Sequence, residues 1–169
     1  LRQAATNSVQ ARSILQTIDG ALARVQDMLF RMKSLTAQSN SGSIDNTQRG
    51  FLDAEYQHLV TEINDSMGLS FDGIFLLDNS FNYDFQVGVN AVTDVIRVNL
   101  SSVWMGGLTS LTTDVLTQAN ALAASAALDA DIDTLSRNRA LVGAYLSRFE
   151  QRGDVIDSSI ENLASAKSS

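Results

Sequence analysis

The feature that most constrains the fold is a heptad stripe at each end of the chain. From Leu1 to Thr36 an apolar or small side chain recurs at alternating spacings of three and four, and the same spacing returns from Leu128 to Lys167. This spacing is typical of long helices that pack along a seam, and the first helix would be about 50 Å long at 1.5 Å per residue. We therefore predict two long helices of matching length that lie side by side, with the middle of the chain folded against them. The first stripe consists of Leu1, Ala4, Ser8, Ala11, Leu15, Ile18, Leu22, Val25, Leu29, Met32 and Thr36.

Arg139 and Gly153 interrupt the second stripe. An arginine at a seam position can extend its charge into solvent, pair with an acidic neighbour or face another subunit. Polar residues in a seam commonly set the register of the helices at some cost in stability. Arg139 is therefore a candidate register or contact residue. The second stripe consists of Leu128, Ile132, Leu135, Arg139, Val142, Leu146, Phe149, Gly153, Ile156, Ile160, Leu163 and Lys167.

A shorter helix is predicted between the two long ones. The first helix should end near Gln38, because the polar residues 39–43 favour a turn. A second helix should run from Asp45 to Met67, since Asp45 and Gln48 resemble a capping box. Its apolar stripe would consist of Leu52, Tyr56, Leu59 and Ile63. The short connection places this helix antiparallel to the first.

The segment that follows has the character of β-structure. A turn is predicted at Asp72-Gly73, with short extended pieces on either side. Residues 85–89 and 95–100 alternate between apolar and polar, which indicates a hairpin with one buried face. Such a hairpin is marginal alone and needs the helices to pack on. Residues 101–113 are predicted to be irregular, and the last helix should begin near Thr117.

The predicted fold is mainly α with a small β part. It is an elongated antiparallel helical rod of two long helices and one shorter helix, packed with a β-hairpin and turn region. We expect one rod domain over residues 1–169, made of a helical hairpin (1–68), a β-hairpin and loop region (69–112) and a long C-terminal helix (113–169).

Composition argues against several functional classes. The net charge is −7 with only two lysines, so a basic surface for nucleic acid or anionic membranes is not expected. No apolar run approaches the ~18 residues of a membrane span. The only histidine, His58, lies in a Glu55-x-x-His58 spacing, but di-iron bundles need a second copy of that motif. With no nucleophile elbow either, we predict no catalytic, metal or cofactor site and no enzyme.

Several motifs, in order along the chain, carry a resemblance to bacterial flagellin. The first helix contains the stretches 13–22 and 31–42; Phe71-Asp-Gly73 precedes Leu76-Leu-Asp78; and residues 85–90 read Phe-Gln-Val-Gly-Val-Asn. The last helix contains Arg139, Gly143-Ala144, Arg148-Phe-Glu150 and Glu161-Asn-Leu163. Together these cover nearly the whole chain, which resembles the core rod domain of flagellin. The extreme termini and the variable outer domains of many flagellins are absent, and Trp104 is unusual for the family.

The resemblance implies a structural subunit of the bacterial flagellar filament, which serves motility. Such a subunit would be exported through the flagellar type III pathway without a cleaved signal peptide, and would contact other flagellin subunits head to tail and laterally. A secretion chaperone and the filament cap would act through the missing termini. The chain begins at Leu1 in the middle of a heptad, so we expect a fragment, and alone we expect it to be a soluble monomer.

The resemblance also implies a contact surface on the first two helices. Flagellins of several bacteria are recognised there by Toll-like receptor 5, and the corresponding positions are Arg31, Leu35 and Glu55, with Phe30 and Gln38 nearby. The same surface should serve subunit packing in the filament. Arg148, in the carboxyl-terminal signature, is a further candidate contact position alongside Arg139.

Two alternatives remain open on the sequence. One is the flagellin-like hook–filament junction protein, which shares the terminal helices. The other is a flagellin-related cell-surface adhesin or carbohydrate-binding protein, in which Trp104, Phe81 and Tyr83 would be exposed stacking groups.

Overall fold

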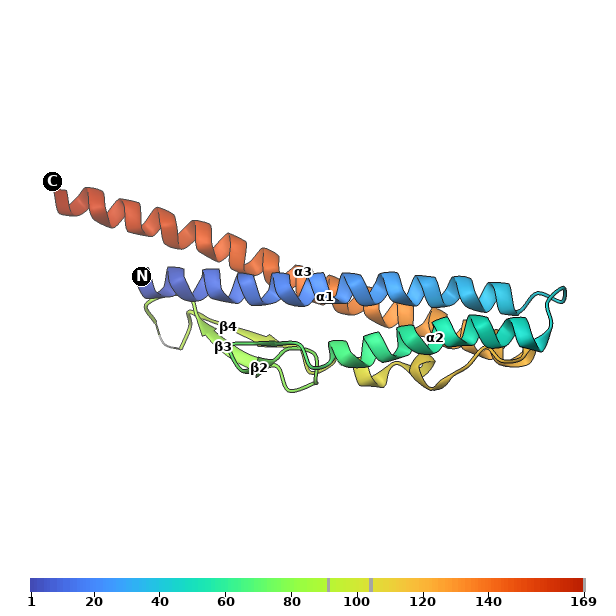
Figure 1. The fold of residues 1–169 in the computed structure, drawn as a ribbon. Coiled ribbons are helices and arrows are strands. Elements are labelled where there is room, and N and C mark those ends of the chain that lie inside the picture. The colour runs from blue at the N-terminus through green and yellow to red at the C-terminus, as the bar shows by residue number, and fades with distance from the viewer. Residues whose placement is uncertain (91, 104, 169) are drawn as a thin grey trace.

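The computed structural model describes residues 1–90, 92–103 and 105–168. It is an elongated helical rod, in which α1 (Arg2–Ser39) and α3 (Gln118–Ser168) lie along each other (Figure 1). The shorter α2 (Asn46–Ser66) and the β-strands lie along one side of this pair. The prediction of a mainly helical rod with a small β part is confirmed.

The seam between α1 and α3 forms most of the core. Every member of the first heptad stripe after Leu1 is buried, with Ile18, Leu22, Val25 and Leu29 at 0 % exposure. The prediction that the two long helices have matching lengths was wrong, because α3 has 51 residues and α1 has 38. The carboxyl-terminal turns of α3 extend past the start of α1 (Figure 1). Leu163, a member of the second stripe, is consequently 58 % exposed.

Polar contacts across the seam fix the register of the two long helices. Arg139 donates from Nε to Asp19 Oδ1 at 3.0 Å and from Nη1 to Gln26 Oε1 at 2.8 Å. Of the three roles considered for Arg139, the structure therefore has the pairing with an acidic neighbour. Arg12–Glu150 (3.8 Å) and Lys33–Asp129 (2.7 Å) join the same two helices further along.

The capping box at the start of α2 is present as predicted. The Asp45 side chain accepts from the backbone N–H of Gln48 at 2.8 Å, and the Asp45 N–H donates to Gln48 Oε1 at 3.1 Å. Arg49, buried just inside the helix, donates to the carbonyls of Ser39 and Ser41. These bonds satisfy backbone groups at the end of α1 and at the start of α2, and so hold the tight antiparallel turn together.

Two small hairpins follow α2. Strand β1 (Ser70–Phe71) pairs with β2 (Ile74–Phe75) around the predicted Asp72-Gly73 turn, where both residues have positive φ. Strand β3 (Asn82–Gln86) pairs antiparallel with β4 (Val95–Asn99). The predicted strand ran on to Val89, but β3 ends at Gln86 and Val89 is 77 % exposed. The chain has already turned there, because the backbone N–H of Asn90 bonds to the Asp94 carboxylate.

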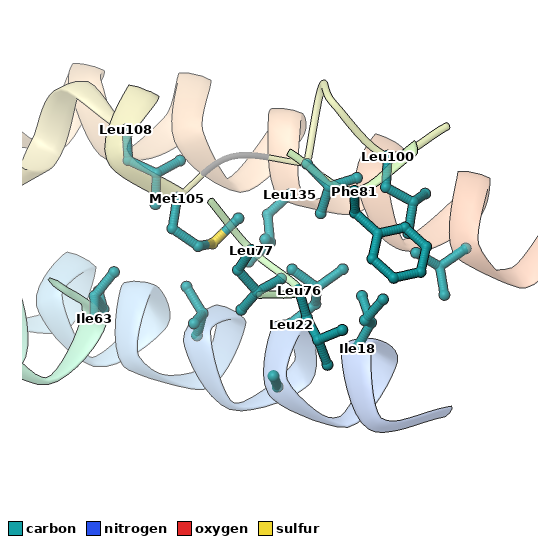
Figure 2. Close-up of a cluster of buried hydrophobic side chains, with 14 of the residues drawn as sticks. Ile18, Leu22, Ile63, Leu76, Leu77, Phe81, Leu100, Met105, Leu108 and Leu135 are labelled. Carbon is teal, nitrogen blue, oxygen red and sulfur yellow. The ribbon is translucent and has the colours of Figure 1, made fainter. Parts of the chain in front are cut away.

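The β-region and the loop after it close the core from the third side. Leu76, Leu77, Phe81, Leu100, Met105 and Leu108 converge with Ile18, Leu22 and Leu135 from the long helices (Figure 2). The segment predicted to be irregular contains two short 3₁₀ helices, η1 (Met105–Gly107) and η2 (Thr109–Thr112). Asp131 of α3 stabilises η2, because its carboxylate accepts from the N–H groups of Thr109 and Ser110. This capping carboxylate is distant in sequence, and local patterns could not show it.

Candidate functional site: a surface on the helical hairpin

The surface singled out from the sequence lies where α1 and α2 run side by side. Arg31 of α1 donates to Glu55 of α2 through two parallel bonds, Nε–Oε1 at 2.6 Å and Nη2–Oε2 at 2.9 Å. Both side chains remain about half exposed, at 51 % and 44 %. The hydrogen bonds from Arg31 hold the pKa of the Glu55 carboxyl below its usual value, and the same bonds raise the pKa of Arg31. The pair thus presents a fixed planar charged group at the surface.

The other positions predicted from the sequence have different locations. Phe30 is 51 % exposed, and Gln38 is exposed at the end of α1. Leu35 is fully buried in the core, so it supports this surface from beneath rather than forming part of it. The structure therefore brings Arg31 and Glu55 together directly and places Leu35 in the core.

Sequence reasoning missed Phe51, which is 74 % exposed on α2. With Gln38, Ser41, Ile44, Gln48 and Leu52 it lines an open groove of ≈ 410 Å³ at the turn between the helices. The signal was present in the sequence, because Phe51 falls outside the apolar stripe of α2 and therefore points away from the core. We call Arg31, Gln38, Phe51 and Glu55 the hairpin face.

The α2 helix is held rigidly beneath the hairpin face. The Tyr56 hydroxyl, buried in the core, donates to the carbonyl of Ser110 and lies 2.7 Å from Thr113 Oγ1. Its burial raises the pKa of the Tyr56 phenol. Asp53 accepts from the backbone N–H of Val115 at 2.9 Å. These bonds fix the rotation of α2 and hence the direction in which Glu55 points.

The remaining candidates do not join this surface. Arg148 is exposed on α3, and no ion pair to it occurs among the described residues. Phe81, proposed as an exposed stacking group, is 1 % exposed because it packs in the β-region core, whereas Tyr83 is 39 % exposed. Trp104 lies outside the described residues. Within the described part of the chain no three potential metal-ligating side chains cluster, and His58 is exposed on α2. In the same part no helix is long and apolar enough to cross a membrane.

The fold defines a class: an elongated rod of two long helices and one shorter helix, packed with two small β-hairpins. Residues 1–82 match the family model of the bacterial flagellin N-terminal helical region. The chain is 33 % identical to a flagellin of Halalkalibacterium halodurans over 99 % of the chain and 63 % of that protein. It is 27 % identical to a flagellar filament core protein of Treponema maltophilum, over 65 % of that protein.

The structural comparison agrees with the sequence comparison. The crystal structure of Bacillus cereus flagellin has a TM-score of 0.76 and 28 % identity, covering 96 % of this chain and 94 % of that one. The chain is therefore similar to flagellins in the sequence of its amino-terminal half and, over nearly its whole length, in its fold. It spans slightly less than two thirds of the length of the curated relatives that it matches.

Proposed function

We propose that this chain is the rod of a structural subunit of the bacterial flagellar filament, and that it is not an enzyme. The observation that carries the proposal is the match to flagellins along 99 % of the chain, together with a rod whose core is one continuous seam. A rod of this kind can contact copies of itself head to tail and side by side. Such heterologous contacts build open helical arrays rather than closed dimers. The subunit would then act outside the cell, in the filament, after export by the flagellar type III pathway.

The decisive experiment is negative-stain electron microscopy of the full-length protein under polymerising conditions. Long filaments of uniform diameter are expected. The chain of residues 1–169 alone should remain monomeric by sedimentation at the same concentration. Full-length protein that never forms filaments, alone or seeded, would refute the proposal. Neither an adhesin nor a hook–filament junction protein is favoured by any contact described above.

The hairpin face is proposed as a contact surface within the filament. Its support is the exposed Arg31–Glu55 pair with exposed Phe51 one turn before Glu55 on α2, because aromatic and arginine side chains commonly dominate protein interfaces. The double reversal Arg31→Glu with Glu55→Arg keeps the pair but exchanges its charges. It should leave the monomer folded and raise the critical concentration for assembly. Unchanged assembly and motility would exclude this role.

The same face is proposed to bind Toll-like receptor 5 when the monomer is free. The support is the exposed Arg31–Glu55 pair that joins the two helices of the hairpin. A receptor-dependent reporter assay with monomer tests this, with Arg31→Ala expected to reduce the signal at least tenfold and Arg137→Ala serving as the control on α3. A secretion chaperone and the filament cap are proposed as partners of the full-length protein.

A further inference from the structure

Two grooves on different flanks of the rod are unlike in charge. The first lies between α1 and the end of α2, has a volume of ≈ 540 Å³, and has an apolar floor that includes Val25, Met28 and Leu69. Glu62 and Asp65 of α2 stand exposed at its edge. Neither has an ion-pair partner among the described residues. Asp27 and Arg24 also line this groove, so its lining carries three carboxylates against one guanidinium.

The second groove lies between α3 and β4 and has a volume of ≈ 360 Å³. Arg148, Arg152 and Val155 line it from α3, and Val155 is 55 % exposed. Arg152 lies 3.7 Å from Asp94, while Arg148 has no ion-pair partner within the described residues. This basic groove therefore presents an exposed valine beside a free guanidinium.

The two grooves face different sides of the rod. The acidic groove opens between α1 and the α2 layer, and the basic groove opens between α3 and the β-layer. Strand β3 lies against α1, where Asn7 donates to the carbonyl of Gln86, and β4 lies against α3, where Tyr145 accepts from the N–H of Asn99. Since α1 and α3 form separate edges of the rod, no single copy can bring its own two grooves together. Two parallel copies side by side can.

We propose that the acidic groove receives the Arg148–Arg152–Val155 stretch of a second copy of this chain. This deepens the filament proposal and rests on it. Val155 would cover the apolar floor beside Met28 and Leu69, and Arg148 would pair with Glu62 or Asp65. Opposite charges at the rim of such a contact set its register more than its strength.

The structure determines the axial offset that this contact would impose between two neighbouring copies. The Arg12–Glu150 pair places Arg152 of α3 level with roughly residue 10 of α1, whereas the acidic groove is centred near Val25. At 1.5 Å per residue, the two grooves are offset by about 22 Å along the rod. Laterally neighbouring rods that use this contact are therefore staggered by about 22 Å.

The first test uses cross-linking in filaments of the full-length protein. Residues 1–169 contain no cysteine, so a pair of introduced cysteines is a clean reporter in this region. Ser66→Cys and Gln151→Cys place one thiol in each groove without changing a charge. Oxidation of the assembled filaments is expected to give covalent ladders in denaturing gels. The control combines Ser66→Cys with Ser158→Cys, which moves the second thiol about 10 Å along α3 and beyond the reach of a disulfide.

The second test uses charge reversal. Arg148→Glu alone, or Glu62→Arg with Asp65→Arg, is expected to raise the critical concentration about fivefold, and the combination should restore assembly most of the way. Arg137→Glu, the same change on an exposed part of α3 outside the groove, should have no effect.

Three outcomes would overturn the inference while leaving the filament proposal intact. They are filaments without the Ser66–Gln151 cross-link, filaments indifferent to both reversals, and a lateral stagger in the imaged filament more than about 10 Å from the expected value. Wild-type protein that forms no filaments would instead refute the proposed function, and this inference with it.

Discussion

Leu22 and Leu163 are both leucines of the heptad stripes, but the structure gives them opposite environments. Leu22 is 0 % exposed at the centre of the seam, and Leu163 is 58 % exposed near the carboxyl-terminal end of α3. A buried leucine truncated to alanine loses its transfer free energy and leaves a cavity, which together cost about 2–5 kcal/mol. An exposed leucine truncated to alanine changes stability by about 0.5 kcal/mol or less. We therefore expect Leu22→Ala to lower the free energy of unfolding by about 3 kcal/mol and Leu163→Ala to leave it nearly unchanged.

The assay is urea unfolding of residues 1–169, followed by circular dichroism at the helix band. The two variants should share the wild-type m-value, because the surface exposed on unfolding is nearly the same, and differ only in the midpoint. Leu122→Ala, at 63 % exposure earlier in α3, provides a second exposed control. If Leu163→Ala destabilised the chain as much as Leu22→Ala, the burial pattern of the seam would be wrong. The same conclusion would follow if Leu22→Ala were neutral.

Three further predictions follow from local geometry. Gly88→Ala should destabilise the chain by about 1–3 kcal/mol, because the added methyl group would overlap the Asp94 side chain. Gly143→Ala, in the open middle of α3, should instead stabilise the chain by up to about 1 kcal/mol. Thermal unfolding of the two variants measures both effects. Asp45→Ala removes the cap of α2 and should cost about 1 kcal/mol in urea unfolding, whereas Asp45→Asn should cost much less. The pKa of the Glu55 carboxyl is lower in the folded chain than in the unfolded chain. The ion pair therefore contributes its full stability at pH values above the unfolded-state pKa, and this contribution is lost as the pH falls through the folded-state pKa. Carboxyl NMR titration should show this pKa rising toward the ordinary range in Arg31→Met, and an unchanged value would contradict the pairing.

Much of the fold could be predicted because local chemistry and tertiary packing agree. The 3–4 spacing of α1 corresponds to its buried face, and the Asp45–Gln48 box marks the start of α2 within one residue. The turn at Asp72-Gly73 was predictable for the same reason, since the local sequence tolerates the positive φ found there.

The failures come from contacts that join distant parts of the chain. The heptad pattern could not show where the packing of α3 against α1 ends, because the exposure of Leu163 depends on where α1 starts. The 3₁₀ helix η2 depends on Asp131, which lies far along the chain in α3. For the hairpin face, alignment by motif selected Arg31 and Glu55 but gave Leu35 the same status. Only burial distinguishes a residue that contacts a partner from one that supports the surface beneath it.

The polar contacts across the α1–α3 seam have a mechanical consequence. Arg12–Glu150, Asp19–Arg139 and Lys33–Asp129 span most of the length of α1. A slip of α3 by one turn, about 5.4 Å, would break all three at once and move every buried side chain out of its place. A pull along the axis of the rod therefore loads the whole seam in shear, and no single contact can open first. Such a rod transmits tension or torsion from one end to the other with little stretching.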